Sequence, residues 1–165
     1  MSGINGKPII FSAEMVRAIL EGRKTMTRRL VNPKRKPLIP GDLLWVKETW
    51  CYNGFGQTHY RATEPEYETY PTFLGWQSSM LMPRCQSRIL LEVTQNRIER
   101  LTDISEEDAK QEGFSDKEAF HDYWNFIYRK KPELQWNENL EVYAISFRKL
   151  ERDKNESKDG MVTEK

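Results

Sequence analysis

The sequence is poor in the features that define several large protein classes. Cysteine occurs only at Cys51 and Cys85, too few and too far apart for a disulfide framework, so both are predicted to be thiols. No apolar run approaches the roughly 20 residues that a bilayer span requires, and the opening MSGINGKPII lacks the apolar stretch of a secretory signal. We therefore expect a cytoplasmic protein that does not enter membranes.

The motifs of the common metal and cofactor enzymes are also missing. The sequence contains no phosphate-binding P-loop, no dinucleotide-binding fingerprint and no Gly-x-Ser-x-Gly nucleophile elbow. Four residues could bind a soft or borderline metal, but they do not form the close pairs of zinc sites: Cys51, His59, Cys85 and His121. We predict neither a metal nor a cofactor.

The length and composition suit one compact domain. Hydrophobic residues make up 38% of the 165 residues and aromatics 12%, which is enough for a core despite a mean hydropathy of −0.79. We predict a domain over residues 1–149, interrupted at about residues 50–83 by an irregular insertion rich in glycine and proline. The charged segment 150–165 is predicted to be a disordered tail.

Hydrophobic periodicity and capping residues predict strands and helices in alternation. Ser12 is predicted to cap a helix that ends at Gly22, and the prolines that follow predict a loop over residues 24–41 with at most a short extended piece. A short helix follows Ser105, and a Ser115–Glu118 capping box begins a longer one. The predicted strands cover residues 7–11, 43–48, 87–100 (one or two strands) and 140–147, with a short strand at 60–62. This order predicts an α+β fold, consistent with a small barrel carrying helices around its rim.

Positive charge is concentrated in one segment although the net charge is only +1. Between positions 23 and 36 there are seven basic residues and no acidic ones, namely Arg23, Lys24, Arg28, Arg29, Lys34, Arg35 and Lys36. Such a patch is typical of a protein that binds a phosphate-bearing partner. The alternative is a solvated charged surface without a ligand.

The same segment contains a lysine three residues before a threonine, Lys24 and Thr27. A threonine hydroxyl needs a base to take its proton, and a lysine whose pKa is lowered by burial or nearby cations can be that base. The spacing therefore permits a nucleophile and its base. The alternative is a phosphate-binding or surface loop in which Thr27 caps a helix.

Three motifs together resemble the ASCH domains, relatives of the PUA superfamily of small RNA-associated β-barrels. They are Gly22-Arg23-Lys24-Thr25-x-Thr27-x-Arg29, Gly41-Asp42-x-Leu44-Trp45-Val46, and Leu101-x-x-Ile104-Ser105-x-x-Asp108-Ala109-x-x-Glu112-Gly113. Further segments resemble the ASCH proteins common in phages and prophages, namely Tyr60-Arg61-Ala62, Met82-Pro83-Arg84 and Ser87-Arg88-Ile89. The resemblance implies a PUA-like barrel with its ligand cleft near the Lys24 motif.

Within that superfamily, small bacterial amidohydrolases remove the acetyl group from N4-acetylcytidine with a lysine, a threonine and a glutamate. The resemblance carries these roles to Lys24, Thr27 and Glu112, and places Arg29 near the pocket. It implies hydrolysis of an amide on a modified cytidine, with a nucleoside or single-stranded RNA as the partner. The residues predicted to bind substrate are Arg23, Arg28, Arg29, Trp45, Glu48, Tyr60 and Arg61. The alternatives are a non-catalytic module that binds RNA or a modified base, and an RNA-cleaving ASCH protein.

Overall fold

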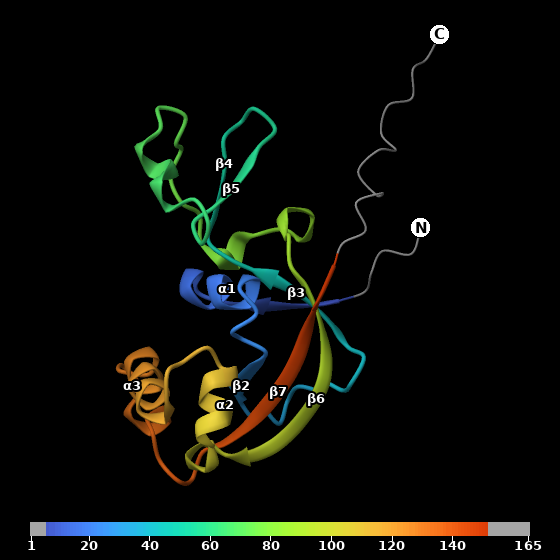
Figure 1. Cartoon of the computed structure of the whole chain (residues 1–165), viewed down its shortest axis with the longest axis vertical. Coiled ribbons are helices and arrows are strands. Elements are labelled where there is room, and N and C mark those ends of the chain that lie inside the picture. The colour runs from blue at the N-terminus through green and yellow to red at the C-terminus, as the bar shows by residue number, and fades with distance from the viewer. Residues whose placement is uncertain (1–5, 152–165) are drawn as a thin grey trace.

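A computed structural model describes residues 6–151, which form one five-stranded sheet and a smaller two-stranded one. The large sheet has the order β1-β3-β6-β7-β2, with β1 and β3 parallel and every other pair antiparallel (Figure 1). Its strands are β1 (Lys7–Ile10), β2 (Met26–Leu30), β3 (Leu43–Lys47), β6 (Leu90–Arg100) and β7 (Glu141–Leu150). Within residues 6–151 this sheet does not close into a barrel, but the predicted α+β class is confirmed. Most of the predicted tail lies outside the described residues, and Leu150, its first residue, ends β7.

Three α-helices cover the sheet: α1 (Ala13–Leu20), α2 (Glu106–Gln111) and α3 (Lys117–Ile127). The predicted cap of α1 is confirmed, because the Ser12 hydroxyl accepts a hydrogen bond from a backbone N–H group of the first turn, and the Ser105 hydroxyl caps α2 in the same way. The predicted Ser115–Glu118 capping box is wrong. Asp116 caps α3 instead, accepting from the Ala119 N–H at 2.8 Å.

Strand β2 lies in the segment predicted to be a loop with at most a short extended piece. It pairs along its whole length with β7, from Met26 opposite Ser146 to Leu30 opposite Val142. Its first three residues are all buried, two of them polar, so the residue pattern lacks the usual alternation of a half-buried strand. Pairing with a distant strand therefore decides its conformation. The three prolines of the segment follow β2 in a loop that leads to β3.

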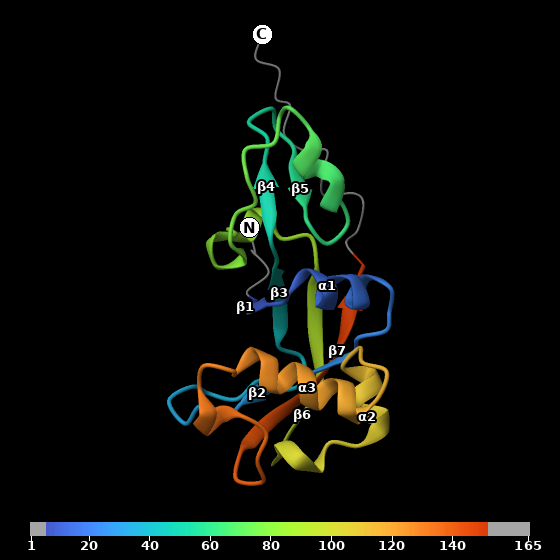
Figure 2. The ribbon, with the colours of Figure 1, turned by 90° about the vertical axis from the view of Figure 1, so that its left-hand side faces the viewer.

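The predicted irregular insertion contains several short regular elements. It contains the antiparallel strands β4 (Trp50–Tyr52) and β5 (Thr58–Tyr60), followed by short 3₁₀ helices. Only Tyr60 of the strand predicted at 60–62 is in β5. Aromatic rings support the segment, with Tyr67 stacked on His59 at a centroid distance of 3.6 Å. Figures 1 and 2 show it as an arm that extends away from α2 and α3.

Two hydrophobic clusters form the core. One joins α1 to the sheet and includes Phe11 and Met15, while the other lies under α2 and α3 and includes Phe120 and Trp124. Figure 2 shows α3 crossing at the end far from the arm, beside β2. Phe114 packs against both clusters, and side chains from both line the cavity of the candidate site.

Candidate active site

A buried ion pair joins two residues that are 88 positions apart. The Lys24 ammonium donates to Glu112 Oε2 at 2.8 Å and to the Glu112 carbonyl at 2.9 Å. Both side chains are at most 3% exposed. Lys24 lies between α1 and β2, and Glu112 is the residue that ends α2.

Gly113 allows α2 to end this close to Lys24. Its φ of 95° lies in the left-handed region, where glycine is favoured. A Cβ at this position would lie 3.3 Å from the Ala18 Cβ and 3.5 Å from the Lys24 Cβ. The glycine thus supplies both the turn and the room that bring Glu112 to the lysine.

Burial lowers the pKa of the Lys24 ammonium below its ordinary value, because desolvation penalises the charged form. Glu112 opposes this shift by attraction and by its hydrogen bond, whereas the positive charges of Arg29 and Arg28 add to it. Desolvation is the largest of these effects. Lys24 therefore loses its proton more readily than an exposed lysine does, and the neutral amine that results is the form that a general base requires.

Arg28 extends the ion pair into a balanced network of three cations and three anions. Its guanidinium donates to Glu99 Oε1 at 3.0 Å, to Asp108 Oδ2 at 2.6 Å and to Glu112 Oε1 at 3.4 Å. Arg97 closes the network by binding Glu99 and Asp108 from the solvent side. Each oxygen of Glu112 therefore has its own cation, which fixes the orientation of the carboxylate.

A small cavity of about 100 Å³ opens beside this network. It is lined by Lys24, Thr27, Arg28, Arg29 and Glu112, and by apolar and aromatic side chains from both core clusters. Thr27 is 2% exposed, and its hydroxyl has no hydrogen-bonding partner among residues 6–151. The structure thus brings the three predicted catalytic residues to one cavity. Their catalytic roles stay predictions.

The aromatic wall of the cavity was not foreseen as part of a site. Tyr123 and Tyr128 come from α3 and its end, where the sequence pattern predicts only a core-facing stripe. Burial raises the pKa of both phenols, so they stay protonated at neutral pH. Phe11 lies between two cations, with Lys24 Nζ at 5.6 Å and Arg29 Cζ at 5.1 Å from its ring centroid.

The predicted substrate-binding residues separate into three groups. Arg28 and Arg29 line the cavity, although the Arg28 donors are already engaged by protein acceptors. Arg23 lies at the surface in an ion pair with Glu21. The other four, at or near the base of the arm, do not line the cavity, namely Trp45, Glu48, Tyr60 and Arg61.

The role of Glu48 is structural. Its carboxylate is 1% exposed and accepts two hydrogen bonds from Arg88, at 2.8 and 2.9 Å. The Arg88 guanidinium in turn lies 4.0 Å from the centroid of the Tyr60 ring. Lys47 and Arg84 lie over the Trp45 ring, and Arg61 is exposed. Through Arg88, Tyr60 of the arm is linked to Glu48, which directly follows β3.

Replacing Arg28 should destabilise the protein far more than replacing Arg97, although both bind Glu99 and Asp108. The Arg28 side chain is fully buried, so Arg28→Leu leaves the three carboxylates of the network with only Lys24 and Arg97 as cations and should lower the free energy of unfolding by about 3–5 kcal/mol. Arg97 is 35% exposed, so Arg97→Leu should cost about 0–1 kcal/mol. Urea unfolding followed by tryptophan fluorescence measures both. If both variants lost the same free energy of unfolding, burial of the arginine would not determine the cost of its removal.

Comparison with known proteins gives a fold but no close relative. No model of a known protein family matches the sequence, and no curated protein matches it. Among solved structures, an ASCH domain from Lactobacillus crispatus JV V101 is 15% identical, with a TM-score of 0.52, over 82% of this chain and 69% of that one. The protein EF3133 from Enterococcus faecalis V583, of family DUF984, is 13% identical with a TM-score of 0.54, over 91% of this chain and 83% of that one. The hypothetical protein PH0355 is 15% identical with a TM-score of 0.50, over 88% of this chain and 100% of that one.

The chain therefore has an α+β fold of the type seen in the ASCH-domain structure. At these sequence identities the similarity establishes only the fold, and the chemistry has to be argued from the residues of the site. None of the helices in residues 6–151 is long and apolar enough to span a bilayer. In the same range, no three histidine, cysteine, aspartate or glutamate side chains are grouped so that they could hold a metal ion. Cys51 and Cys85 are free thiols.

Proposed function

We propose that this protein is an amidohydrolase that removes the acyl group from an N4-acylated cytidine, with Thr27 as nucleophile and Lys24 as its base. The observation that carries the proposal is the buried Lys24–Glu112 pair beside a cavity that the free hydroxyl of Thr27 lines. A hydroxyl nucleophile requires a nearby base, and a buried lysine with a lowered pKa lines the same cavity as the Thr27 hydroxyl. The ASCH-type fold supports a nucleoside or RNA as the substrate class.

In the proposed reaction, Thr27 Oγ attacks the amide carbonyl carbon while the neutral Lys24 amine takes the hydroxyl proton. The negative charge that forms on the carbonyl oxygen is stabilised by Arg29 or by backbone N–H groups. The C–N bond then breaks, the Lys24 ammonium gives its proton to the leaving N4 amine, and an acyl ester remains on Thr27. Water hydrolyses that ester with Lys24 again as base, releasing the carboxylic acid and restoring Thr27.

Glu112 and Arg28 have supporting roles in this scheme. Glu112 holds the lysine in place and stabilises its ammonium form after proton transfer. Arg28 binds the other Glu112 oxygen and keeps the carboxylate oriented. Arg28 is thus a positioning residue and not a substrate ligand.

The size of the cavity limits what can enter it. A single water needs roughly 10–15 Å³, so about 100 Å³ admits several waters or a small group, whereas drug-sized ligands need roughly 300 Å³ or more. The cavity therefore suits the acyl amide edge of a base, with the rest of the nucleoside outside. Phe11 and Tyr123 supply aromatic surface for the base.

Incubation with a panel of acylated cytidines tests the proposal. The panel contains N4-acetylcytidine, longer N4-acyl cytidines and short RNAs carrying the same base, with products identified by mass. We expect cytidine and the free carboxylic acid in equal amounts from at least one substrate. Thr27→Ala is the matched negative control. If the wild-type protein hydrolyses none of them, the proposal falls and a binding module becomes the better interpretation.

A further inference from the structure

The arm, which spans residues 50–83, carries an excess of negative charge. Its acidic residues are Glu64, Glu66 and Glu68, and Arg61 is its only lysine or arginine. Figures 1 and 2 show that the arm extends away from α2 and α3, where the candidate active site lies. An excess of one charge on a protruding segment favours a partner of the opposite charge.

A pocket of about 410 Å³ in the arm concentrates this charge. We call it the arm pocket. Glu64 and Glu66 line it, and no lysine or arginine does. Glu64 Oε2 lies 2.7 Å from His59 Nδ1, and the Glu66 side chain has no hydrogen-bonding or ionic partner within residues 6–151. The arm pocket therefore presents carboxylate oxygens that no lysine or arginine of the described chain neutralises.

Aromatic rings complete the arm pocket. The buried ring of Tyr67 stacks on His59 and on Tyr70, at centroid distances of 3.6 and 5.4 Å, which fixes the inner wall. Phe55 and Tyr70 line the same pocket and are 79% and 55% exposed, so their rings are available to a partner. A guanidinium suits such a lining, because it has only hydrogen-bond donors, stays charged and packs on aromatic rings. The arm pocket thus fits an arginine side chain.

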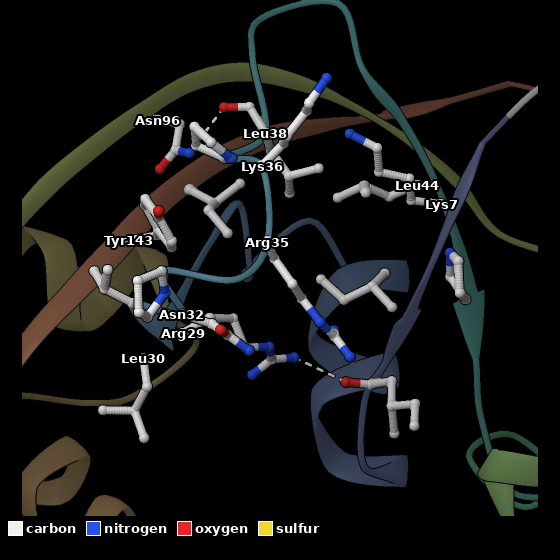
Figure 3. Close-up of a pocket in the computed structure, with 17 residues that line it drawn as sticks. Lys7, Arg29, Leu30, Asn32, Arg35, Lys36, Leu38, Leu44, Asn96 and Tyr143 are labelled. Atoms are coloured by element: carbon white, nitrogen blue, oxygen red, sulfur yellow. Dashed lines mark hydrogen bonds between the residues drawn. The ribbon is translucent and has the colours of Figure 1, made fainter.

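The loop after β2 carries the complementary charge on the same chain. Residues 31–38 include Lys34, Arg35 and Lys36 and no acidic residue. Arg35 and Lys36 are exposed, and their side chains have no hydrogen-bonding or ionic partner within residues 6–151. Figure 3 shows both beside a hollow of about 870 Å³ that the loop and β1 line. The loop therefore offers an arginine whose side-chain donors are all available.

This loop is held in place before any partner binds. The Asn32 side chain accepts from the Lys34 N–H at 2.9 Å, and the Asn96 amide donates to the Leu38 carbonyl at 2.9 Å. Two prolines restrict the backbone between these two anchors. A preorganised loop loses little conformational freedom when it forms an interface.

The loop does not fill the arm pocket of its own chain. The arm pocket and the hollow beside the loop share no lining residue, and Figures 1 and 2 show the arm and the loop on opposite sides of α1. We propose that two copies of this chain form a reciprocal dimer, in which Arg35 of each copy occupies the arm pocket of the other. In a two-fold dimer this contact occurs twice, because each copy contributes one arm and one loop. Aromatic residues and arginine are also the types enriched where interfaces are strongest.

Sedimentation equilibrium of the full chain, at low and at high salt, tests the dimer. The wild type should dimerise at low salt and dissociate as salt screens the contact. The arm variant E64K/E66K and the loop variant R35E/K36E should each weaken dimerisation by at least about tenfold, because each places like charges together. E66K alone keeps the contact between Glu64 and His59 and should weaken dimerisation less than the double arm variant does.

An equimolar mixture of the two double variants is the most discriminating measurement. In the mixture a reversed arm meets a reversed loop, and a native arm meets a native loop. The mixture should therefore form a heterodimer although neither variant dimerises alone, which also shows that both variants fold. The controls E133K/E138K and R100E/K110E make the same charge changes at exposed residues outside the arm pocket and the loop, and should dimerise like the wild type.

The outcomes concern the interface alone. A wild type that stays monomeric at low salt, an equal loss in the controls, or a mixture that stays monomeric would each overturn the proposed dimer. A heterodimer in the mixture together with dimeric controls supports it. None of these results depends on whether the protein hydrolyses an acylated cytidine, so the dimer and the proposed function stand or fall separately.

Discussion

Thr27→Ala should abolish hydrolysis of N4-acylated cytidine while the protein still folds and binds. The substitution removes the proposed nucleophile, and loss of a nucleophile lowers kcat by at least on the order of 10³-fold. Thr27→Ser should retain part of the activity because the hydroxyl survives. The effect on substrate binding should be small, about 0.5–1.5 kcal/mol for one lost hydrogen bond. Single-turnover kinetics together with equilibrium binding separate the two effects.

Thr25→Ala provides the matched control for this prediction. Thr25 lies two residues away, is exposed and does not line the cavity. Its backbone N–H donates to the Gln111 carbonyl and its carbonyl accepts from the Phe147 N–H, and alanine preserves both hydrogen bonds. Activity of Thr27→Ala close to that of Thr25→Ala would exclude a nucleophilic Thr27.

Lys24→Arg should be nearly as damaging to turnover as Lys24→Ala, with a loss of roughly 10²–10⁴-fold. Arginine keeps the positive charge beside Glu112 but cannot become a neutral base at any accessible pH. A site that only binds its ligand through charge would tolerate the same change. Measuring deacylation and RNA affinity on this one variant therefore decides between a catalytic and a purely binding Lys24, and thermal unfolding checks that both variants fold.

The pH dependence of kcat/KM gives an independent readout of Lys24. The rate should rise with pH as the ammonium loses its proton, and it should level off below the ordinary lysine pKa of 10.5 because burial lowers the pKa. Glu112 raises the pKa of Lys24, so Glu112→Gln should move the rising limb to lower pH while reducing the maximal rate. A rising limb that does not move in this variant would show that another group titrates.

Local elements could be predicted from the sequence because their signals are local. The capped start of α1, the acidic first turn of α2 and the β3 strand all follow from residues within a few positions of one another. Strand β2 could not be predicted, since its conformation depends on pairing with β7 more than 100 residues further on. The arm between residues 50 and 83 depends in the same way on aromatic contacts inside it that no short pattern specifies.

The candidate site shows the same contrast between local signals, which the sequence reveals, and contacts between distant residues, which it does not. The Lys24 and Thr27 spacing is visible in the sequence, but Glu112 could be added only through the family resemblance, because the Lys24–Glu112 contact spans 88 positions. The Arg28 network was missed for this reason: Glu99 and Asp108 lie 71 and 80 positions from Arg28. Trp45 and Tyr60 are predicted to bind substrate, yet neither lines the cavity, and their rings pack against Arg84 and Arg88.

The position of β2 in the sheet also bears on how the site is made during synthesis. β2 is an edge strand whose only neighbour in the sheet is β7, the last strand of the described chain. A ribosome therefore releases Thr27 and Arg28 early, but their strand has no partner until nearly the whole domain has emerged. The nascent chain can build the β1–β3–β6 part of the sheet first. The buried charges around Arg28 then come together only in the final docking step, so the candidate site is complete only once the last strand is in place.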